Sequence, residues 1–171
     1  MLVLQENEYA PFYKPYIQAI LANKKTLLES LSETSSESLS LLKNLPPEKL
    51  LFSYAEGKWI IKEIIQHLID AERIMAYRAL RFARNDMTEL PGFDENDYVI
   101  SSNGNKRNIG GLLKEMKLVR KTTILMFKNF KENDLMNLGM ANGSNMSVRA
   151  LGYIIAGHQL HHMNIIKERY L

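Results

Sequence analysis

Apolar residues recur at three- and four-residue steps in four separate stretches of this chain. This spacing places them on one face of an α-helix, so each stretch is expected to pack that face against the others. The expected helices cover residues 23–44, 59–84 and 108–130, and a last helix begins at Ser147. The periodicity therefore predicts an all-α fold in which four helices form a bundle.

The segments between the expected helices carry signals of chain turns. Asn23 is a candidate cap for the first helix, and Pro46 and Pro47 are expected to stop it. Residues 9–16 are aromatic and interrupted by two prolines, and we expect them to pack across the bundle. Residues 129–146 are rich in Asn, Gly and Ser, so a loop is expected there.

The longest connection, residues 85–107, separates the second and third helices and contains Pro91-Gly92, an acidic run and a Ser- and Asn-rich run. A structureless connection of this length is uncommon inside a compact domain, and such segments are often lids or binding loops. We expect a long crossover between helices, and a contribution to a binding pocket is the second interpretation.

The composition excludes several classes of protein. A chain of 171 residues fits one domain, so residues 1–171 are expected to form a single domain. Its 46% hydrophobic and 24% charged residues are typical of a globular protein rather than a disordered or fibrous one. The net charge of +3 is dispersed without a basic patch, which argues against nucleic-acid binding. No apolar run approaches the ~18 residues of a membrane span, so we expect a cytoplasmic protein without membrane contact.

Three of the four histidines lie in one short segment near the end of the chain, which has no cysteine. On a helix, His158 and His162 point to the same side and lie about 6 Å apart along the axis. They straddle the centre of the apolar stripe, whereas His161 lies about 90° to one side of that centre. His67 lies at the edge of the apolar face of the second helix. We therefore predict that His67, His158 and His162 form a three-histidine site for a divalent metal ion.

The alternative is that these residues are core histidines with hydrogen-bond partners. Two imidazoles in the middle of a core stripe would lose hydration without compensation unless a cation were present, so the spacing alone leaves both interpretations open. Glu63 and Asp70 flank His67 and either orient its ring or are solvated carboxylates. Gln159 stands where the zinc-protease motif His-Glu-x-x-His has its general base, and an amide cannot take up a proton, so such a protease is disfavoured.

Arg120 falls within the apolar stripe of the third helix. Because an unpaired buried charge costs several kcal/mol, this guanidinium needs a partner or a polar cavity. Asp70 or Glu72 is the candidate partner in a structural ion pair. In the other interpretation Arg120 anchors an anionic substrate.

Several spaced motifs resemble the DinB-like superfamily, in the right order and over most of the chain from about residue 9. They are residues 56–63 (EGKWIIKE), 67–73 (HLIDAER), 77–84 (YRALRFAR), 90–95 (LPGFDE) and 156–162 (AGHQLHH). The resemblance implies a four-helix bundle, often dimeric, that holds Zn²⁺, Ni²⁺ or a related ion through His67, His158 and His162. One departure is Ile60, where relatives commonly have Ser or Thr, so a capping box with Glu63 lacks its first member.

The resemblance also implies a chemistry. Characterised relatives include bacillithiol S-transferases, a mycothiol-dependent maleylpyruvate isomerase and a domain of ergothioneine synthases, and many others are labelled metal-dependent hydrolases. We therefore expect a homodimeric metal-dependent enzyme that activates water or a small thiol and acts on a small molecule, with Arg120 and residues 85–107 shaping the pocket. Because the chain has no cysteine, a thiol must arrive as a cosubstrate. The alternative function is a non-catalytic helical module for dimerisation or partner binding, with a structural or vestigial metal site.

Overall fold

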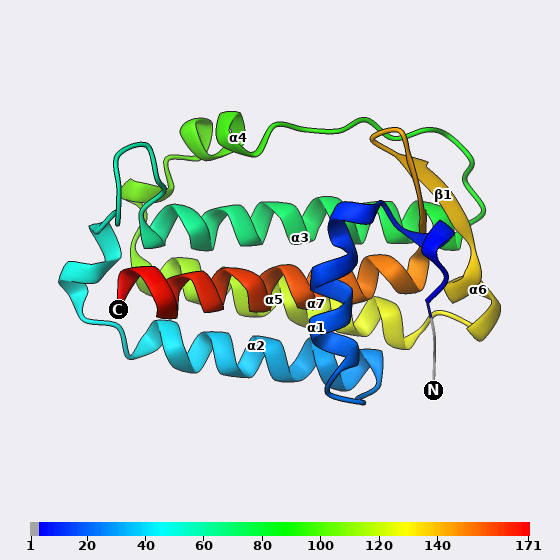
Figure 1. The fold of residues 1–171 in the computed structure, drawn as a ribbon, viewed down its shortest axis with the longest axis horizontal. Coiled ribbons are helices and arrows are strands. Elements are labelled where there is room, and N and C mark those ends of the chain that lie inside the picture. The colour runs from blue at the N-terminus through cyan, green and yellow to red at the C-terminus, as the bar shows by residue number, and fades with distance from the viewer. Residues whose placement is uncertain (1–3) are drawn as a thin grey trace.

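Four long helices dominate the computed structural model, which describes residues 4–171 (Figure 1). They are α2 (Leu27–Lys43), α3 (Ile61–Ala83), α5 (Ile109–Lys128) and α7 (Val148–Ile165), and α7 continues as a π-helical turn over Ile166–Tyr170. Each lies within the stretch where the apolar periodicity predicts a helix. The predicted all-α four-helix bundle is therefore confirmed.

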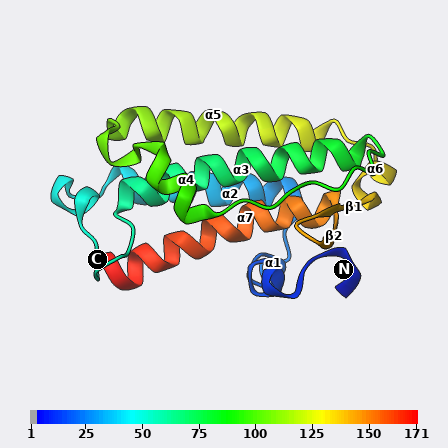
Figure 2. The ribbon, with the colours of Figure 1, turned by 90° about the horizontal axis from the view of Figure 1, so that it is seen from above.

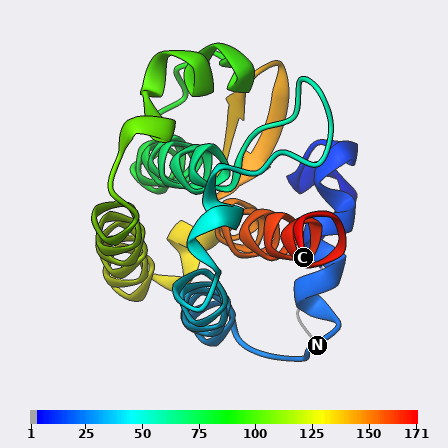
Figure 3. The same ribbon diagram turned by 90° about the vertical axis from the view of Figure 1, so that its left-hand side faces the viewer.

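The packing order of the helices differs from their order in the chain. Helix α3 packs against α5 and α7, and α2 packs against the same two helices, so α2 and α3 occupy opposite corners of the bundle (Figure 3). This arrangement turns the apolar face of α3 directly toward α7. As a result, the segment around His67 faces the segment around His158 and His162.

The long connection between α3 and α5 follows from the direction of these two helices. Figure 1 shows that α3 and α5 run the same way, so the chain must return along the whole bundle before α5 begins. The prediction of a crossover is correct, but the segment is not structureless. It contains α4 (Glu95–Ser102), whose first turn is capped by the Asp94 carboxylate, and a 3₁₀ turn over Gly104–Lys106 (Figure 2).

The start of α2 corrects the expectation that Asn23 caps this helix. Thr26 is the cap: its backbone N–H donates to the Glu29 carboxylate at 2.8 Å, and its hydroxyl accepts from the Glu29 N–H at 3.3 Å. Asn23 instead belongs to the turn after α1, where Lys24 has a positive φ of 54°. A reciprocal capping box fixes the helix start more firmly than a lone asparagine.

The aromatic N-terminal segment crosses the bundle, as predicted, and forms the short helix α1 (Lys14–Leu21) against α7 (Figure 1). Gly157 permits this close crossing. A Cβ at this position would collide with the backbone carbonyl of Tyr16, so only glycine allows the two helices to approach so closely. The crossing brings Tyr16 beside the histidines of α7.

Residues 129–146 are not the loop that their composition predicts. They form α6 (Glu132–Met136) and an antiparallel hairpin of β1 (Leu138–Ala141) and β2 (Ser144–Ser147). Asn142 and Gly143 both have positive φ, the geometry that Asn-Gly provides in a two-residue hairpin turn. The hairpin leads into Ser147, whose hydroxyl caps α7 by accepting from the Ala150 N–H at 3.0 Å, as predicted.

Two clusters of apolar side chains fill the interior along the bundle. One lies around α1, α7 and the hairpin and includes Ile17, Leu31, Phe82 and Leu151. The other includes Leu42, Ile61, Ile65, Leu112 and Ile166. Within the described residues no helix is long and apolar enough to cross a membrane.

Candidate metal centre

Three histidine rings from two helices converge inside the bundle. The Nε2 atom of His158 lies 3.1 Å from Nε2 of His67 and 3.1 Å from Nε2 of His162. One ring nitrogen from each residue lies within 4.8 Å of the other two. His67 comes from α3 and the other two from adjacent turns of α7, so the group exists only because these helices face each other.

Burial keeps these imidazoles neutral. Desolvation lowers the pKa of His67 to about 4 and the pKa of His158 to about 3, and the neighbouring rings of His67 and His161 contribute further to the shift at His158. Burial, followed by the adjacent imidazoles, also holds the pKa of His162 well below its usual value. At neutral pH each ring therefore has a lone pair available for a metal ion.

The donor set and its spacing fit a divalent ion. Bonds of 2.0–2.1 Å in tetrahedral geometry separate two imidazole nitrogens by about 3.3 Å, close to the two short separations found around His158. Hydrogen bonds alone explain the arrangement poorly. The Nε2 atom of His158 carries either one proton or one lone pair, yet it faces two partners at equal distance. A cation would use all three lone pairs.

Aromatic side chains from two other segments hold the rings in place. The Trp59 indole, just before α3, lies 4.8 Å from the His67 ring between centroids. Tyr16 of α1 lies 5.7 Å from the His158 ring and 5.0 Å from the His161 ring. These contacts restrict rotation of the rings.

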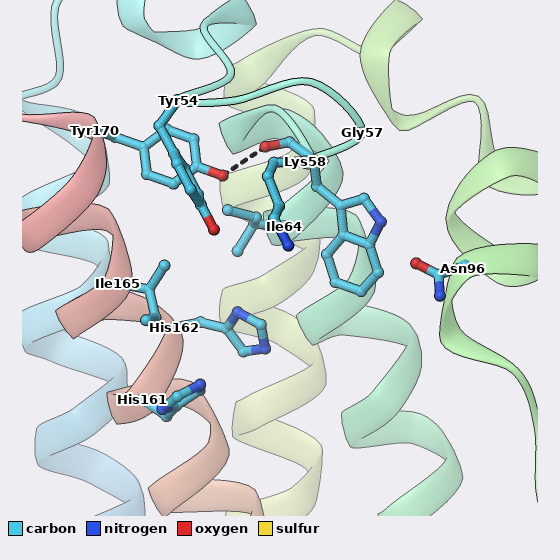
Figure 4. Close-up of a pocket in the computed structure, with 10 residues that line it drawn as sticks. Tyr54, Gly57, Lys58, Ile64, Asn96, His161, His162, Ile165 and Tyr170 are labelled. Atoms are coloured by element: carbon cyan, nitrogen blue, oxygen red, sulfur yellow. Dashed lines mark hydrogen bonds between the residues drawn. The ribbon is translucent and has the colours of Figure 1, made fainter.

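A pocket of about 300 Å³ borders the group at His162 (Figure 4). Its wall is largely aromatic and apolar, with a few polar side chains, which is typical of small-molecule sites. The lining residues are Tyr54, Gly57, Lys58, Trp59, Ile64, Asn96, His161, His162, Ile165 and Tyr170. Asn96 belongs to α4, so the crossover segment does contribute to this pocket, as the second interpretation of residues 85–107 anticipated.

The carboxylates that flank His67 in the sequence serve other partners. The Ile60 N–H donates to Glu63 at 3.0 Å, so Glu63 caps α3 even though Ile60 contributes no hydroxyl. The Asp70 carboxylate accepts from the Gln66 amide at 3.0 Å. Within residues 4–171 neither carboxylate forms a hydrogen bond with the His67 ring. His161 stands beside the converging rings, on the pocket wall.

Arg120 is 2% exposed and paired with Glu72, one of the two partners that the sequence suggests. Its guanidinium donates to both Glu72 oxygens at 2.8 and 2.9 Å and to the Leu31 carbonyl and the Thr34 hydroxyl at 2.8 and 3.0 Å. The structural ion pair is therefore confirmed. Arg120 does not line the pocket beside His162, and its role as a substrate anchor has no support from this geometry.

Gln159 faces the interior rather than the converging rings. It lines a small cavity together with His158, Glu72 and Arg120, and within residues 4–171 its side-chain amide has no hydrogen-bond partner. An amide in this position cannot serve as a general base. The sequence argument against a zinc-protease arrangement and the position of the side chain therefore agree.

The residues that sequence reasoning missed are those around the rings: Tyr16, Tyr54, Lys58, Trp59 and Asn96. All lie outside the four long helices, where apolar periodicity carries no information about which way a side chain points. The motif at residues 56–63 (EGKWIIKE), which contains Lys58 and the single tryptophan Trp59 shortly before His67, was the available signal.

Comparison with known proteins agrees with this architecture. The sequence matches the family model of the DinB superfamily over residues 30–166, a range that includes all three converging histidines. No curated protein matches the sequence. Among solved structures, the chain is similar to YfiT from Bacillus subtilis, with a TM-score of 0.71, 14% identity, and coverage of 98% of this chain and 90% of that chain. YfiT is described as a probable metal-dependent hydrolase with an unusual four-helix bundle topology. At this identity the likeness establishes the fold alone.

Proposed function

The chain belongs to the DinB superfamily, and on that premise we propose that it is a metal-dependent enzyme whose ion is held by His67, His158 and His162. The observation that carries this proposal is the convergence of three neutral imidazoles beside a pocket of about 300 Å³. A divalent ion bound by three neutral ligands keeps its full charge and an open position, and it lowers the pKa of a coordinated water or thiol.

The chain's own residues would bind and orient the reactants. Trp59 and Tyr16 hold the imidazoles in place, and the aromatic wall of the pocket suits the body of a small organic molecule. No carboxylate lines this pocket in the described part of the chain, so a carboxylate general base is not part of the proposal. Imidazole ligands suit zinc and nickel, and we propose one of these as the native metal.

Two reaction classes follow from an activated nucleophile: hydrolysis by water and transfer of a small thiol to an electrophile. The description of YfiT as a probable metal-dependent hydrolase supports the first, and the resemblance to thiol-transferring relatives supports the second. Because the chain has no cysteine, the thiol of the second reaction is a cosubstrate. A panel of esters, amides and thiol–electrophile pairs, tested with zinc- and nickel-loaded protein, separates the two classes.

The metal itself is tested by elemental analysis of untagged protein purified without a nickel column. We expect one divalent ion per chain, lost in His158→Ala and His162→Ala. His161→Ala is the matched control, because this neighbouring imidazole lies outside the converging group, and its metal content should stay unchanged. Metal-free wild-type protein whose stability equals that of the variants would favour the non-catalytic module instead.

We also propose that the protein is a homodimer. The outer surface of α3 and α5 exposes four large apolar side chains, Tyr77, Leu80, Leu118 and Leu125, each at least 39% exposed. A second copy that packs on α3 and α5 would cover these side chains. Light scattering after gel filtration should give twice the mass of 19.7 kDa for the wild type and the monomer mass for Leu118→Glu. A monomeric wild type would contradict the proposal.

A further inference from the structure

The pocket beside His162 is lined by a positive charge and by no negative one, among the residues that the structure describes. Among the described residues that line it, Lys58 is the one lysine or arginine, and none is an aspartate or glutamate. Figure 4 shows the Lys58 side chain directed into the pocket toward His162, with the Tyr54 side chain beside it pointing the same way. The charged and polar ends of these two side chains therefore face the space that a substrate would occupy.

The loop that carries Lys58 is fixed by internal hydrogen bonds. The Ser53 hydroxyl lies 2.7 Å from the Ala55 carbonyl and 2.8 Å from the Lys58 carbonyl, and the Lys58 N–H donates to the Ala55 carbonyl at 3.2 Å. Gly57 supplies the positive φ of 72° that this turn requires.

The residue after Lys58 is also anchored. The Tyr170 hydroxyl donates to the Trp59 carbonyl at 2.6 Å, which ties the loop to the end of the chain. The backbone on both sides of Lys58 is therefore held before any ligand arrives, which fixes the point from which the exposed Lys58 side chain extends.

Nearby carboxylates are engaged elsewhere or exposed to solvent. Glu63 lies close to the pocket, but its carboxylate accepts from the Ile60 N–H at 3.0 Å. Glu95 and Asp97 flank Asn96 on α4 and lie on the exposed surface. Within residues 4–171 no salt bridge involves Lys58. Three neutral imidazoles would add nothing negative, so the pocket favours an anion.

We propose that Lys58 determines substrate specificity by binding the carboxylate of a small organic acid, whose reactive end reaches the His67–His158–His162 group. The aromatic side chains of Tyr54 and Trp59 contact the body of this acid, and the Tyr54 hydroxyl adds a hydrogen bond to its carboxylate. This inference rests on the proposed function, since it names the substrate class of that site.

The test uses cobalt-loaded protein and two matched thiols, mercaptopropanoate and mercaptopropanamide. Each thiol binds the ion and produces a sulfur-to-cobalt absorption band, so titration gives a dissociation constant without any turnover. We expect wild-type protein to bind the acid about two- to fivefold more tightly than the amide. In Lys58→Gln the two thiols should bind equally well, with the amide affinity unchanged.

Lys117→Gln is the matched control, because Lys117 is an exposed lysine of α5 outside the pocket. It removes the same charge and should keep the preference for the acid. A preference that survives in Lys58→Gln would mean that the carboxylate binds elsewhere, for instance to the ion, and would overturn the inference. Equal affinities in the wild type would overturn it as well. Failure to bind cobalt at all would overturn the proposed function, and the inference with it.

Discussion

The interior of the bundle contains two polar clusters that differ in how they are satisfied. The Glu72–Arg120 pair is closed: the guanidinium reaches both carboxylate oxygens, a backbone carbonyl and a hydroxyl, all within 3.0 Å. The histidine group, which begins five residues earlier on α3, is open: its imidazole nitrogens face one another at 3.1 Å without an opposite charge. The first cluster is complete within the protein, whereas the second provides lone pairs for something from outside.

This difference separates structural polar groups from functional ones. Glu72, Arg120 and His67 are buried and the other two histidines are half-buried, and both clusters combine residues from remote parts of the chain. Burial alone therefore does not identify a site. What distinguishes the histidines is that their neutral form leaves an unfilled acceptor at each ring and that a pocket reaches them.

The largest effect is expected when the closed pair is broken. Arg120→Leu should destabilise the protein by about 3–5 kcal/mol, because Glu72 would remain buried without a partner. Urea denaturation in the presence of a chelator measures this loss. Replacing both residues by leucine should restore most of the stability. Metal content per folded chain should not change in either variant, and a change would show that the two clusters are not independent.

The second-largest effect is expected when zinc binds the histidine group. Free zinc at 1,000 times its dissociation constant should stabilise the wild-type protein by about 4 kcal/mol, because the folded state alone assembles the three ligands. Thermal unfolding at several zinc concentrations measures the shift. His67→Ala should show no such dependence, whereas His161→Ala should behave like the wild type. Equal shifts in all three proteins would contradict a specific site.

Lowering the pH should decrease the free energy of unfolding of the metal-free protein, over a pH range set by the pKa values of the histidines. The folded-state pKa values of about 4 for His67 and about 3 for His158 lie below the usual value of 6.5, so the unfolded chain binds more protons between these limits. The contribution of the neutral imidazoles to the free energy of unfolding is complete above pH 6.5. It decreases as the pH falls toward 4, by roughly 1.4 kcal/mol per pH unit for each ring that stays neutral in the folded state. Urea midpoints between pH 6.5 and 5 should show this slope, and it should be shallower in His67→Phe.

The smallest effect is expected at Gln159, which lines the small cavity between the two clusters. Its amide has no hydrogen-bond partner within residues 4–171, so Gln159→Leu should leave stability unchanged or raise it by about 1 kcal/mol. The same urea experiment measures it. A clear loss of stability would show that a bound water satisfies this amide in solution.

Sequence reasoning succeeded where a residue lies on a long periodic helix. The helical periodicity of the sequence predicted that His158 and His162 lie on one face of a helix. The structure brings both rings to His67. It failed for Asn142 and Gly143, where a composition rich in polar residues concealed a hairpin turn. It also left two partners open for Arg120, because both candidate carboxylates lie on the same helix and only the relative rotation of α3 and α5 selects Glu72.

The sequence by itself determined the four helices and the histidines that face the core, because a repeat of three to four residues sets both the helix and its buried side. Tertiary structure alone decided that α2 and α3 lie at opposite corners and that α1 crosses α7 at Gly157. It also decided that Lys58, Tyr54 and Asn96 surround the same pocket. These outcomes depend on contacts between segments that are remote in the chain, and such contacts leave no periodic pattern within any one of them.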